Sequence, residues 1–250
     1  MLDQALQLAD AFPEHHWIFG PGVDLDADYR DDSNQLQHRR RQFGNMLLTR
    51  APILSSRNYL LPKHGLTEAL SLQRCALEGL IAASSEPLRI YTTHLAHASA
   101  AERQDQITLL LSIIRNLPLS AGVWSAGSGG PTHWTETGQP PPVPARAFLM
   151  GDFNLTPFDA EYDLLVGKMD PARGRLTRVD TLVDAWVGSN SGPVDQPTCV
   201  ESALGNRPQR GVRLDYLFVT PDLSDSVKGM TIDETAQGSD HQPIFAEIEI

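Results

Sequence analysis

Short apolar runs that end in carboxylate, amide or imidazole side chains recur along this chain, and this pattern constrains its fold most. An apolar strand that ends in a polar side chain can hold that group rigidly and aim it at a point shared with other strands. The pattern therefore predicts that the polar clusters converge on one site. In chain order they are Gly44-Asn45, Thr93-His94-Leu95, Gly151-Asp152-Phe153-Asn154, Arg213-Leu214-Asp215-Tyr216 and Ser239-Asp240-His241.

Length and charge set the outer limits. With 250 residues and 41% apolar content, the chain can bury a substantial core, and we expect one domain over residues 1–250. A formal net charge of −11 argues against broad neutralisation of a nucleic-acid backbone. Cys75 and Cys199 lack the spacing of a disulfide framework or a zinc site, so both are expected to be buried. The opening residues contain Asp3 and Asp10 and no long apolar stretch, which predicts a soluble cytoplasmic protein without a transmembrane segment.

Hydrophobic periodicity predicts two clear helices and a set of strands. The chain opens with a helix over 2–12, and residues 21–42, first acidic and then basic, are expected to form a surface loop. The helix over 99–116 starts at a Ser99/Glu102 capping box and carries Arg103 on its apolar face, where a guanidinium needs a partner or an anion. Strands are expected at 45–49, 73–81, 88–95, 147–150, 214–219 and 244–250, with a short helix near 159–166.

Residues 120–145 are rich in Gly, Pro and Ser and are expected to form a long loop insertion. The loop carries Trp124, His133 and Trp134, which could form a substrate lid or a self-packed surface loop.

The residue types at the strand ends favour metal and proton chemistry. Asp152 and Asn154 are two residues apart and can point the same way, and their oxygen atoms suit Mg²⁺ or Mn²⁺ better than zinc, although such a pair also caps turns. His241 beside Asp240 can act as a general base, or can lie on a surface turn. An unpaired buried carboxylate is costly, so Asp215 is expected to face a partner such as His241.

Taken in order, the motifs resemble those of the endonuclease/exonuclease/phosphatase superfamily: His94-Leu95, Arg103 on the following helix, Gly151-Asp152-Phe153-Asn154, Arg213-Leu214-Asp215-Tyr216 and Ser239-Asp240-His241. The similarity extends from about Gly44 to the end of the chain. It implies an α+β fold, a four-layer α/β/β/α sandwich of two mixed β-sheets flanked by helices. It also implies a divalent-metal-dependent phosphoesterase, in first place a phosphodiesterase or nuclease-like hydrolase using Mg²⁺ or Mn²⁺.

The resemblance gives each site residue a role. Asp152 and Asn154 would lie at the metal and nucleophile side of the phosphate, and Asp240 would bind the metal directly or through water. His241 would be the general base that activates water, with Asp215 orienting it.

Three further residues receive roles nearer the substrate. His94 would hydrogen-bond a phosphate oxygen or assist the leaving group, although a lone His at a strand end is more often packed. Asn45 and Arg103 are assigned to substrate binding. The substrate itself stays open between a small phosphodiester, a phospholipid headgroup and a nucleic acid, because one fold serves many substrates.

The beginning of the chain departs from the family pattern. Members of the family start with a strand carrying an Asn and a second strand ending in Gln-Glu, whose Glu is the main metal ligand. Neither is expected before Gly44, which suggests that the sequence lacks an N-terminal segment of the full domain. We would then expect exposed apolar surface, weaker metal binding that impairs this form, and a homodimer through exposed sheet edges.

Two alternatives compete with the hydrolase. One is a degenerate member of the family that binds a phosphorylated ligand or a protein partner without catalysis. The other is a structural module whose sheet edges pair with a partner. The hydrolase ranks first because so many costly polar groups are placed together at strand ends.

Overall fold

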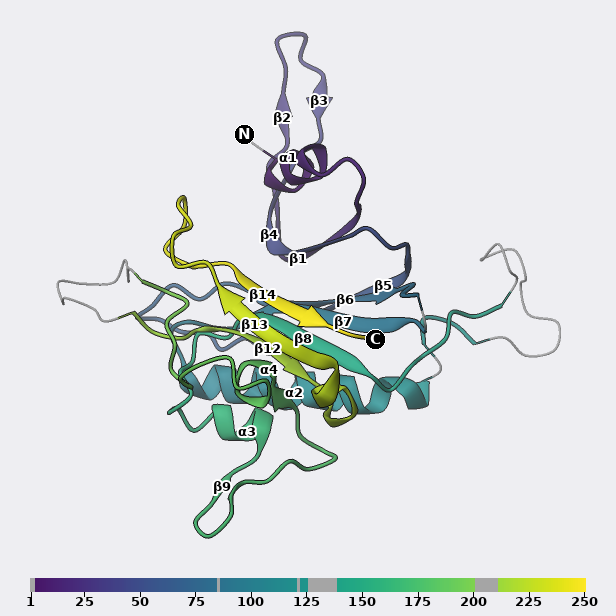
Figure 1. Ribbon diagram of the computed structural model, residues 1–250. Helices are drawn as coiled ribbons and strands as arrows, with labels where there is room; N and C mark the ends of the chain where they lie inside the picture. The colour runs from purple at the N-terminus through teal and green to yellow at the C-terminus, as the bar shows by residue number, and fades with distance from the viewer. Residues whose placement is uncertain (1–2, 85, 121, 126–138, 201–210) are drawn as a thin grey trace.

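A six-stranded mixed sheet forms the centre of the computed structural model, which describes residues 3–84, 86–120, 122–125, 139–200 and 211–250 (Figure 1). Strand β7 pairs in parallel with β8, and the other neighbouring strands of this sheet are antiparallel. In spatial order the strands are β11 (Val183–Asp184), β12 (Asp215–Val219), β8 (Ala147–Asp152), β7 (Leu88–His94), β6 (Cys75–Ile81) and β5 (Ile53–Leu60).

Alternation along the strands gives this sheet two different faces. One face carries Tyr91, Leu149 and Phe218, which form the main core with Ile107 and Leu110 of helix α2 (Ala100–Asn116). The short helix α3 (Tyr162–Val166) lies on the same side as α2 and packs in this core (Figure 1). Helix α4 (Ala185–Gly188) instead packs through Ala185 and Trp186 with apolar residues of the opposite face. The structure therefore has a helical layer on one side of the central sheet.

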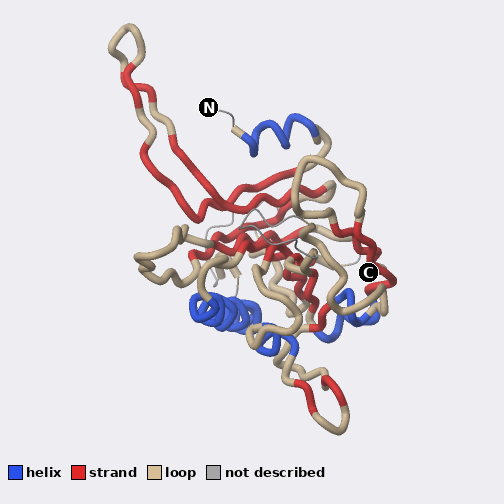
Figure 2. Tube along the Cα trace, turned by 90° about the vertical axis from the view of Figure 1, so that its left-hand side faces the viewer, coloured by secondary structure: helices blue, strands red, loops and turns tan. Residues whose placement is uncertain are grey.

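Two separate two-stranded ribbons lie over the opposite face (Figures 1 and 2). One pairs β13 (Val227–Ile232) with β14 (Ile244–Ile248), and the other pairs β1 (His16–Asp26) with β4 (Arg40–Thr49). The second ribbon continues into the β2–β3 hairpin (Tyr29–Arg30 and Leu36–Gln37), which projects from the body as an arm. The α+β sandwich predicted from the sequence is confirmed.

The remaining elements are short. Helix α1 (Gln4–Ala11) buries none of its described residues, and Asp3 caps it by accepting a hydrogen bond from the Leu6 amide. Among the described residues, no helix is both long and apolar enough to span a lipid bilayer. The other short elements are the 3₁₀ helices η1 (Leu117–Ser120) and η2 (Pro221–Ser226), and the β9–β10 hairpin (Met169–Asp170 and Gly174–Arg175).

The predicted loop over 21–42 is wrong. Most of this segment belongs to β1, the β2–β3 hairpin and β4, so a strand does precede Gly44. Its acidic and basic halves face each other across the ribbon: Asp24 is paired with Arg40, and Asp28 accepts hydrogen bonds from the Arg39 amide and the His38 ring. Opposite charges on facing strands stabilise the pairing. In the sequence alone, the same run of acidic and then basic residues resembles a polar loop.

Strands β5 and β13 were also not expected from the sequence. In β5 exposed and half-buried residues alternate, and the sequence includes Ser55, Ser56, Arg57 and Asn58. Such a strand lies at a sheet edge, where few apolar side chains are needed. Of the expected loop insertion over 120–145, Trp124 is described, whereas His133 and Trp134 lie outside the described residues.

An apolar trough of about 480 Å³ runs along the sheet face beside the β13–β14 ribbon. Ile90, Met150 and Leu217 of the sheet line its floor, and Met230 and Ile244 line the ribbon side. The trough reaches Asp215 at one end. Because alternate residues of a strand share a face, the polar ends of β7, β8 and β12 lie on the same face as the trough.

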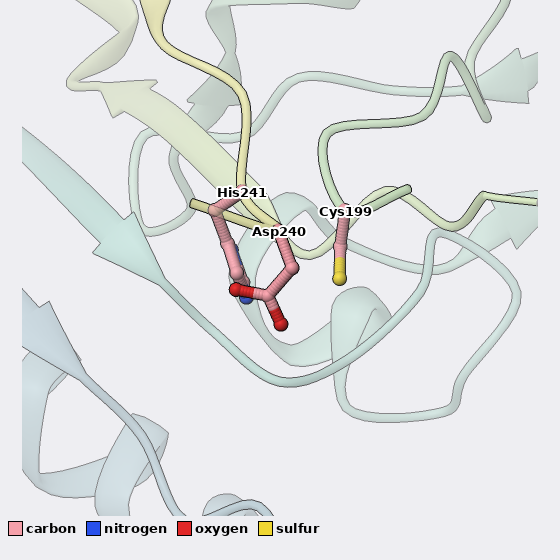
Figure 3. A group of neighbouring side chains, drawn as sticks. All are labelled: Cys199, Asp240 and His241. Atoms are coloured by element: carbon pink, nitrogen blue, oxygen red, sulfur yellow. The ribbon is translucent and has the colours of Figure 1, made fainter. Parts of the chain in front are cut away.

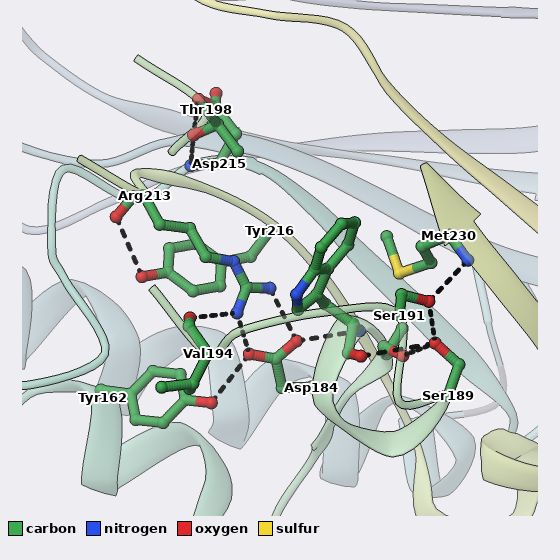
Figure 4. A network of polar contacts seen from close by, with 12 residues as sticks. Tyr162, Asp184, Ser189, Ser191, Val194, Thr198, Arg213, Asp215, Tyr216 and Met230 are labelled. Atoms are coloured by element: carbon green, nitrogen blue, oxygen red, sulfur yellow. Dashed lines mark hydrogen bonds and ion pairs between the residues drawn. The ribbon is translucent and has the colours of Figure 1, made fainter. Parts of the chain in front are cut away.

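A buried ion pair fixes the loop before β12. Arg213 donates to both carboxylate oxygens of Asp184, at 2.9 and 2.8 Å, and the two side chains are 1% and 2% exposed (Figure 4). Asp184 also accepts hydrogen bonds from the Tyr162 hydroxyl and the Trp186 amide. The guanidinium lies 4.4 Å from the centre of the Tyr216 ring. This pair therefore anchors the segment that leads into Asp215.

Replacing Asp184 with alanine should destabilise the fold by about 3–5 kcal/mol, because it leaves the Arg213 charge buried without its partner. Urea unfolding followed by circular dichroism measures this change. Asp180→Ala is the matched control, since its ion pair with Arg178 is exposed and its loss should cost less than about 1 kcal/mol. Equal midpoints for the two variants would contradict the assignment of Arg213–Asp184 as an anchor.

Candidate active site

Three polar side chains form a row across neighbouring strands at one end of the sheet. Asp152, at the end of β8, lies opposite His94 of β7 and opposite Asp215 of β12. Residues that face each other across paired strands project from the same side of a sheet. His94 Nε2 lies 3.2 Å from Asp152 Oδ2. The sheet register thus brings together three clusters that are far apart in the sequence.

A fourth residue joins the row from the C-terminal part of the chain. His241 Nδ1 lies 2.8 Å from Asp215 Oδ2. The Thr198 hydroxyl donates to the same Asp215 oxygen at 2.7 Å and accepts hydrogen bonds from the Leu214 and Asp215 amides. The carboxylate is therefore held from two sides, and the imidazole ring is oriented by it. The expected pairing of Asp215 with His241 is present in this geometry.

The Gly151–Asn154 turn depends on close backbone packing. Gly151 has a φ of +139°, and a Cβ atom at this position would lie 1.9 Å from the Thr93 carbonyl oxygen, so only glycine fits. Asp152 Oδ1 accepts the Asn154 amide at 2.8 Å, and the Asn154 side-chain nitrogen donates to the Leu95 carbonyl at 3.0 Å and to Asp152 Oδ2 at 3.3 Å. This leaves the Asn154 side-chain oxygen as the acceptor beside the Asp152 carboxylate.

Burial changes the charge balance in the row. It raises the pKa of Asp152 to about 6, and the neighbouring Asp215 carboxylate adds to the effect although the Asn154 amide opposes it. Burial also raises the pKa of Asp215, against hydrogen bonds from Thr198 and His241. Two carboxylates thus face each other with incompletely compensated negative charge, which a cation would stabilise.

The two histidines titrate in opposite directions. Burial and the nearby Arg74 guanidinium lower the pKa of His94 to about 4, so this ring is neutral near pH 7. Burial also acts to lower the pKa of His241, but attraction and hydrogen bonding by Asp215, with smaller effects of Asp152 and Asp240, raise it overall. His94 can therefore donate or accept as a neutral ring, whereas His241 changes charge at a pH above its usual range.

Two residues near the row were not singled out by sequence reasoning. Thr198 is fully buried and positions Asp215. Arg74, before β6, is 5% exposed, contacts His97 Nδ1 at 3.2 Å and lies 5.4 Å from the Phe43 ring centre. It supplies positive charge toward Asp152. An isolated arginine before an apolar strand gives no sequence signal of this role.

Other predicted residues have contacts outside the row. Asn45 donates to the Cys75 carbonyl at 2.9 Å, which ties β4 to β6. Arg103 pairs with Glu161 at 2.9 Å and donates to the Ala96 and His97 carbonyls, so it holds the segment that follows His94. Both interactions support the shape of the site. Their assignment to substrate binding stays a prediction.

Asp240 precedes His241 and is exposed, and its backbone carbonyl accepts a hydrogen bond from the Val200 amide. The donors at Asp152 and Asn154 are carboxylate and amide oxygens, which suit a hard divalent cation. Burial and the Asp215 carboxylate raise the pKa of Asp152, so a cation beside this carboxylate would stabilise its ionised form. The residues present therefore fit a divalent cation held by Asp152 and Asn154.

Comparison with known proteins gives the class of protein. A family model described as the endonuclease/exonuclease/phosphatase family matches residues 2–241, and the chain belongs to this family. Over 119 residues it is 29% identical to a DNA-(apurinic or apyrimidinic site) endonuclease 2 from Schizosaccharomyces pombe. That match covers 42% of this chain and 23% of the relative, so it spans under a quarter of the relative's length.

Solved structures share the fold at low sequence identity. An endonuclease/exonuclease/phosphatase from Bacteroides vulgatus has a TM-score of 0.60 at 18% identity, covering 98% of this chain and 81% of that one. A mannosyl-6-phosphatase from Bacteroides thetaiotaomicron has 0.58 at 16% identity, covering 99% and 81%. TDP2 from D. rerio, complexed with a single-strand DNA product, has 0.53 at 17% identity, covering 97% and 88%. At these identities the solved structures show that the fold is shared.

Proposed function

We propose that this protein is a divalent-metal-dependent hydrolase of phosphoester bonds in which His241 is the general base. Among such hydrolases, a phosphodiesterase ranks first. The observation that carries this proposal is the row of His94, Asp152 and Asp215 with His241 joined to it at 2.8 Å. A base oriented by a carboxylate, beside an acidic oxygen site, is the arrangement that water attack on a phosphoester needs.

The proton chemistry follows from the contacts of the His241 ring. Because Nδ1 is hydrogen-bonded to Asp215, Nε2 is the nitrogen that takes a proton from water. Asp215 stabilises the imidazolium that forms, and Thr198 keeps this carboxylate in place. The ring is 31% exposed by side-chain area, so water can reach it.

The phosphate would be contacted from the His94 end of the row, opposite the end that carries His241. His94 is neutral and can hydrogen-bond a phosphate oxygen or the leaving group, and Arg74 adds positive charge nearby. Asp152 and Asn154, with Asp240 directly or through water, would hold Mg²⁺ or Mn²⁺. When bound, the cation would neutralise charge that develops on the phosphate.

A panel of phosphoesters tests this proposal: a chromogenic phosphodiester, a chromogenic phosphomonoester, a short DNA single strand, a duplex with an abasic site and a phospholipid dispersion. Hydrolysis that requires Mg²⁺ or Mn²⁺ and stops with a chelator would support it. Metal binding by calorimetry without turnover of any of these would favour the non-catalytic alternative, a member of the family that binds a phosphorylated ligand or a protein partner. The homodimer through sheet edges stays a prediction.

The pH dependence of the rate should report the Asp215–His241 pair. The pKa of His241 is raised above 6.5, the usual value for histidine. Because the base acts only when neutral, kcat should rise with pH through a midpoint above 6.5. Asp215→Asn removes the attraction that raises this pKa, and the midpoint should move to lower pH while the maximal rate falls. Rates of a chromogenic phosphodiester measured across the pH range give both quantities. An unchanged midpoint in Asp215→Asn would contradict the role of the pair.

A further inference from the structure

A second group of possible metal ligands lies at the edge of the proposed catalytic site. Within the part of the chain that the structure describes, Cys199, Asp240 and His241 are the group of three whose ligand atoms all lie within 4.8 Å of one another. The three side chains point to the same side of the backbone (Figure 3). They differ from the Asp152–Asn154 donors in ligand type: they include a sulfur atom and an imidazole nitrogen.

The backbone holds these residues together. Cys199 and His241 are partners in an antiparallel bridge, and residues in such a pair project from the same side. The Val200 amide donates to the Asp240 carbonyl at 3.0 Å, and the Gln242 amide donates to the Thr198 carbonyl at 2.6 Å. Two segments that are far apart in the sequence are thus fixed side by side, and the proximity does not depend on flexible side chains alone.

The histidine is already oriented as metal-binding histidines are. Such residues usually give their second ring nitrogen to a carboxylate, which fixes the tautomer and strengthens the ligand. The contact of His241 Nδ1 with Asp215 at 2.8 Å supplies this support, and Thr198 holds Asp215 in turn. This is a second observation, independent of the spacing of the three ligand atoms, and it leaves Nε2 for an ion.

The ligand types select the ion. Thiolate and imidazole prefer zinc, whereas carboxylate and amide oxygens prefer magnesium or manganese. In a tetrahedral zinc site neighbouring ligand atoms lie about 3.3–3.8 Å apart, as follows from bond lengths of about 2.0–2.3 Å. Because the three ligand atoms lie within 4.8 Å of one another, the widest pair must close by up to about 1.5 Å. Asp240 is exposed and can rotate, which also gives the ion a path from solvent.

We propose that Cys199, Asp240 and His241 bind one Zn²⁺ ion, and that this ion inhibits the hydrolase by occupying the nitrogen that would accept the proton from water. The inhibition rests on the proposed function, whereas the binding does not. On binding, the Cys199 thiol releases its proton to solvent, and water completes the coordination. The site is distinct in chemistry from the oxygen site at Asp152 and Asn154, although it competes with that site for Asp240.

Titration with Co²⁺, a spectroscopic substitute for Zn²⁺, tests the binding on the full chain. We expect one equivalent to produce a thiolate-to-cobalt charge-transfer band that Zn²⁺ displaces. Cys199→Ala should lose the band and weaken Zn²⁺ binding by more than about 100-fold, the upper range for loss of a supporting contact alone. Cys75→Ala, which changes the other buried cysteine, should keep the cobalt band and the Zn²⁺ affinity of the unmodified protein. Circular dichroism verifies that both variants are folded, and Cys199→Ser repeats the test with a smaller change in shape.

The outcomes separate the binding from the inhibition. No band in the unmodified protein, or a band that persists in Cys199→Ala, would overturn the site. Zn²⁺ inhibition of Mg²⁺-dependent hydrolysis that disappears in Cys199→Ala would support the inhibitory role, and equal inhibition of both proteins would overturn it. Thiolate-dependent binding in a protein that hydrolyses no phosphoester would support the zinc site and overturn the proposed function instead.

Discussion

Replacement of His241 by alanine should lower kcat for phosphoester hydrolysis by about 100- to 10,000-fold, the usual contribution of a general base. His241 is joined to Asp215 and supplies the ring nitrogen that can take a proton from water. The variant should stay folded, because the ring is partly exposed and does not belong to the buried apolar core. Steady-state kinetics with saturating Mg²⁺ and a thermal unfolding curve measure the two effects.

His38→Ala is the matched control for this variant. His38 also contacts a carboxylate, Asp28 at 3.0 Å, but it lies on the arm and its side chain is 80% exposed. Its replacement should leave kcat and the unfolding temperature unchanged. If His241→Ala retained the full rate in the same assay, the assignment of the general base would be wrong.

Asp152→Asn should abolish metal-dependent turnover, with a loss of at least about 1,000-fold in kcat/KM, while stability is kept or increased. The loss is expected because a neutral amide replaces the carboxylate that would hold the cation. The stability effect follows from the pKa of Asp152, which burial raises from its usual 3.8 to about 6. The folded state therefore prefers the protonated carboxyl, and above pH 6 the charged form destabilises it relative to the unfolded chain. Asn removes that unfavourable charge.

Unfolding temperatures at pH 5 and pH 8, together with Mn²⁺ titration by calorimetry, test this prediction. The unfolding temperature should be equal or higher in Asp152→Asn at pH 8, with a smaller difference at pH 5, and heat from Mn²⁺ binding should be lost. Asp225→Asn, an exposed carboxylate in η2, is the control and should change neither quantity. Normal metal-dependent turnover in Asp152→Asn would show that the turn has only a structural role.

Much of the site could be predicted because its signals are local. An apolar run followed by Gly151 and Asp152 predicts a buried strand that ends in a sharp turn, and the structure has β8 ending at Asp152. Ser99 three residues before Glu102 predicts the start of α2, and the Ser99 hydroxyl accepts the Glu102 amide there. In both cases the physical cause lies within a few residues of the signal.

The missed features depend on contacts between distant segments. The end of strand β1 and the hairpin that follows it read as a polar, charged stretch, and only pairing with β4 gives Asp24 its partner Arg40. The second half of the Ser99 capping box is also absent, because the Glu102 carboxylate accepts hydrogen bonds from the His64 amide and Gln106 instead. Arg74 and Thr198 gain their roles from neighbours that the sequence does not place beside them.

The sequence by itself determined the strands that end in His94, Asp152 and Asp215, the family of the chain and the chemical types at its site, because hydrophobic alternation and turn residues act locally. The tertiary structure decided the order in which these three residues lie in one row, the 2.8 Å contact through which Asp215 joins His241 to it, and the position of Cys199 beside His241. Strand order and register set these distances. They arise from burial of apolar surface and backbone pairing over the whole chain, which no local pattern specifies.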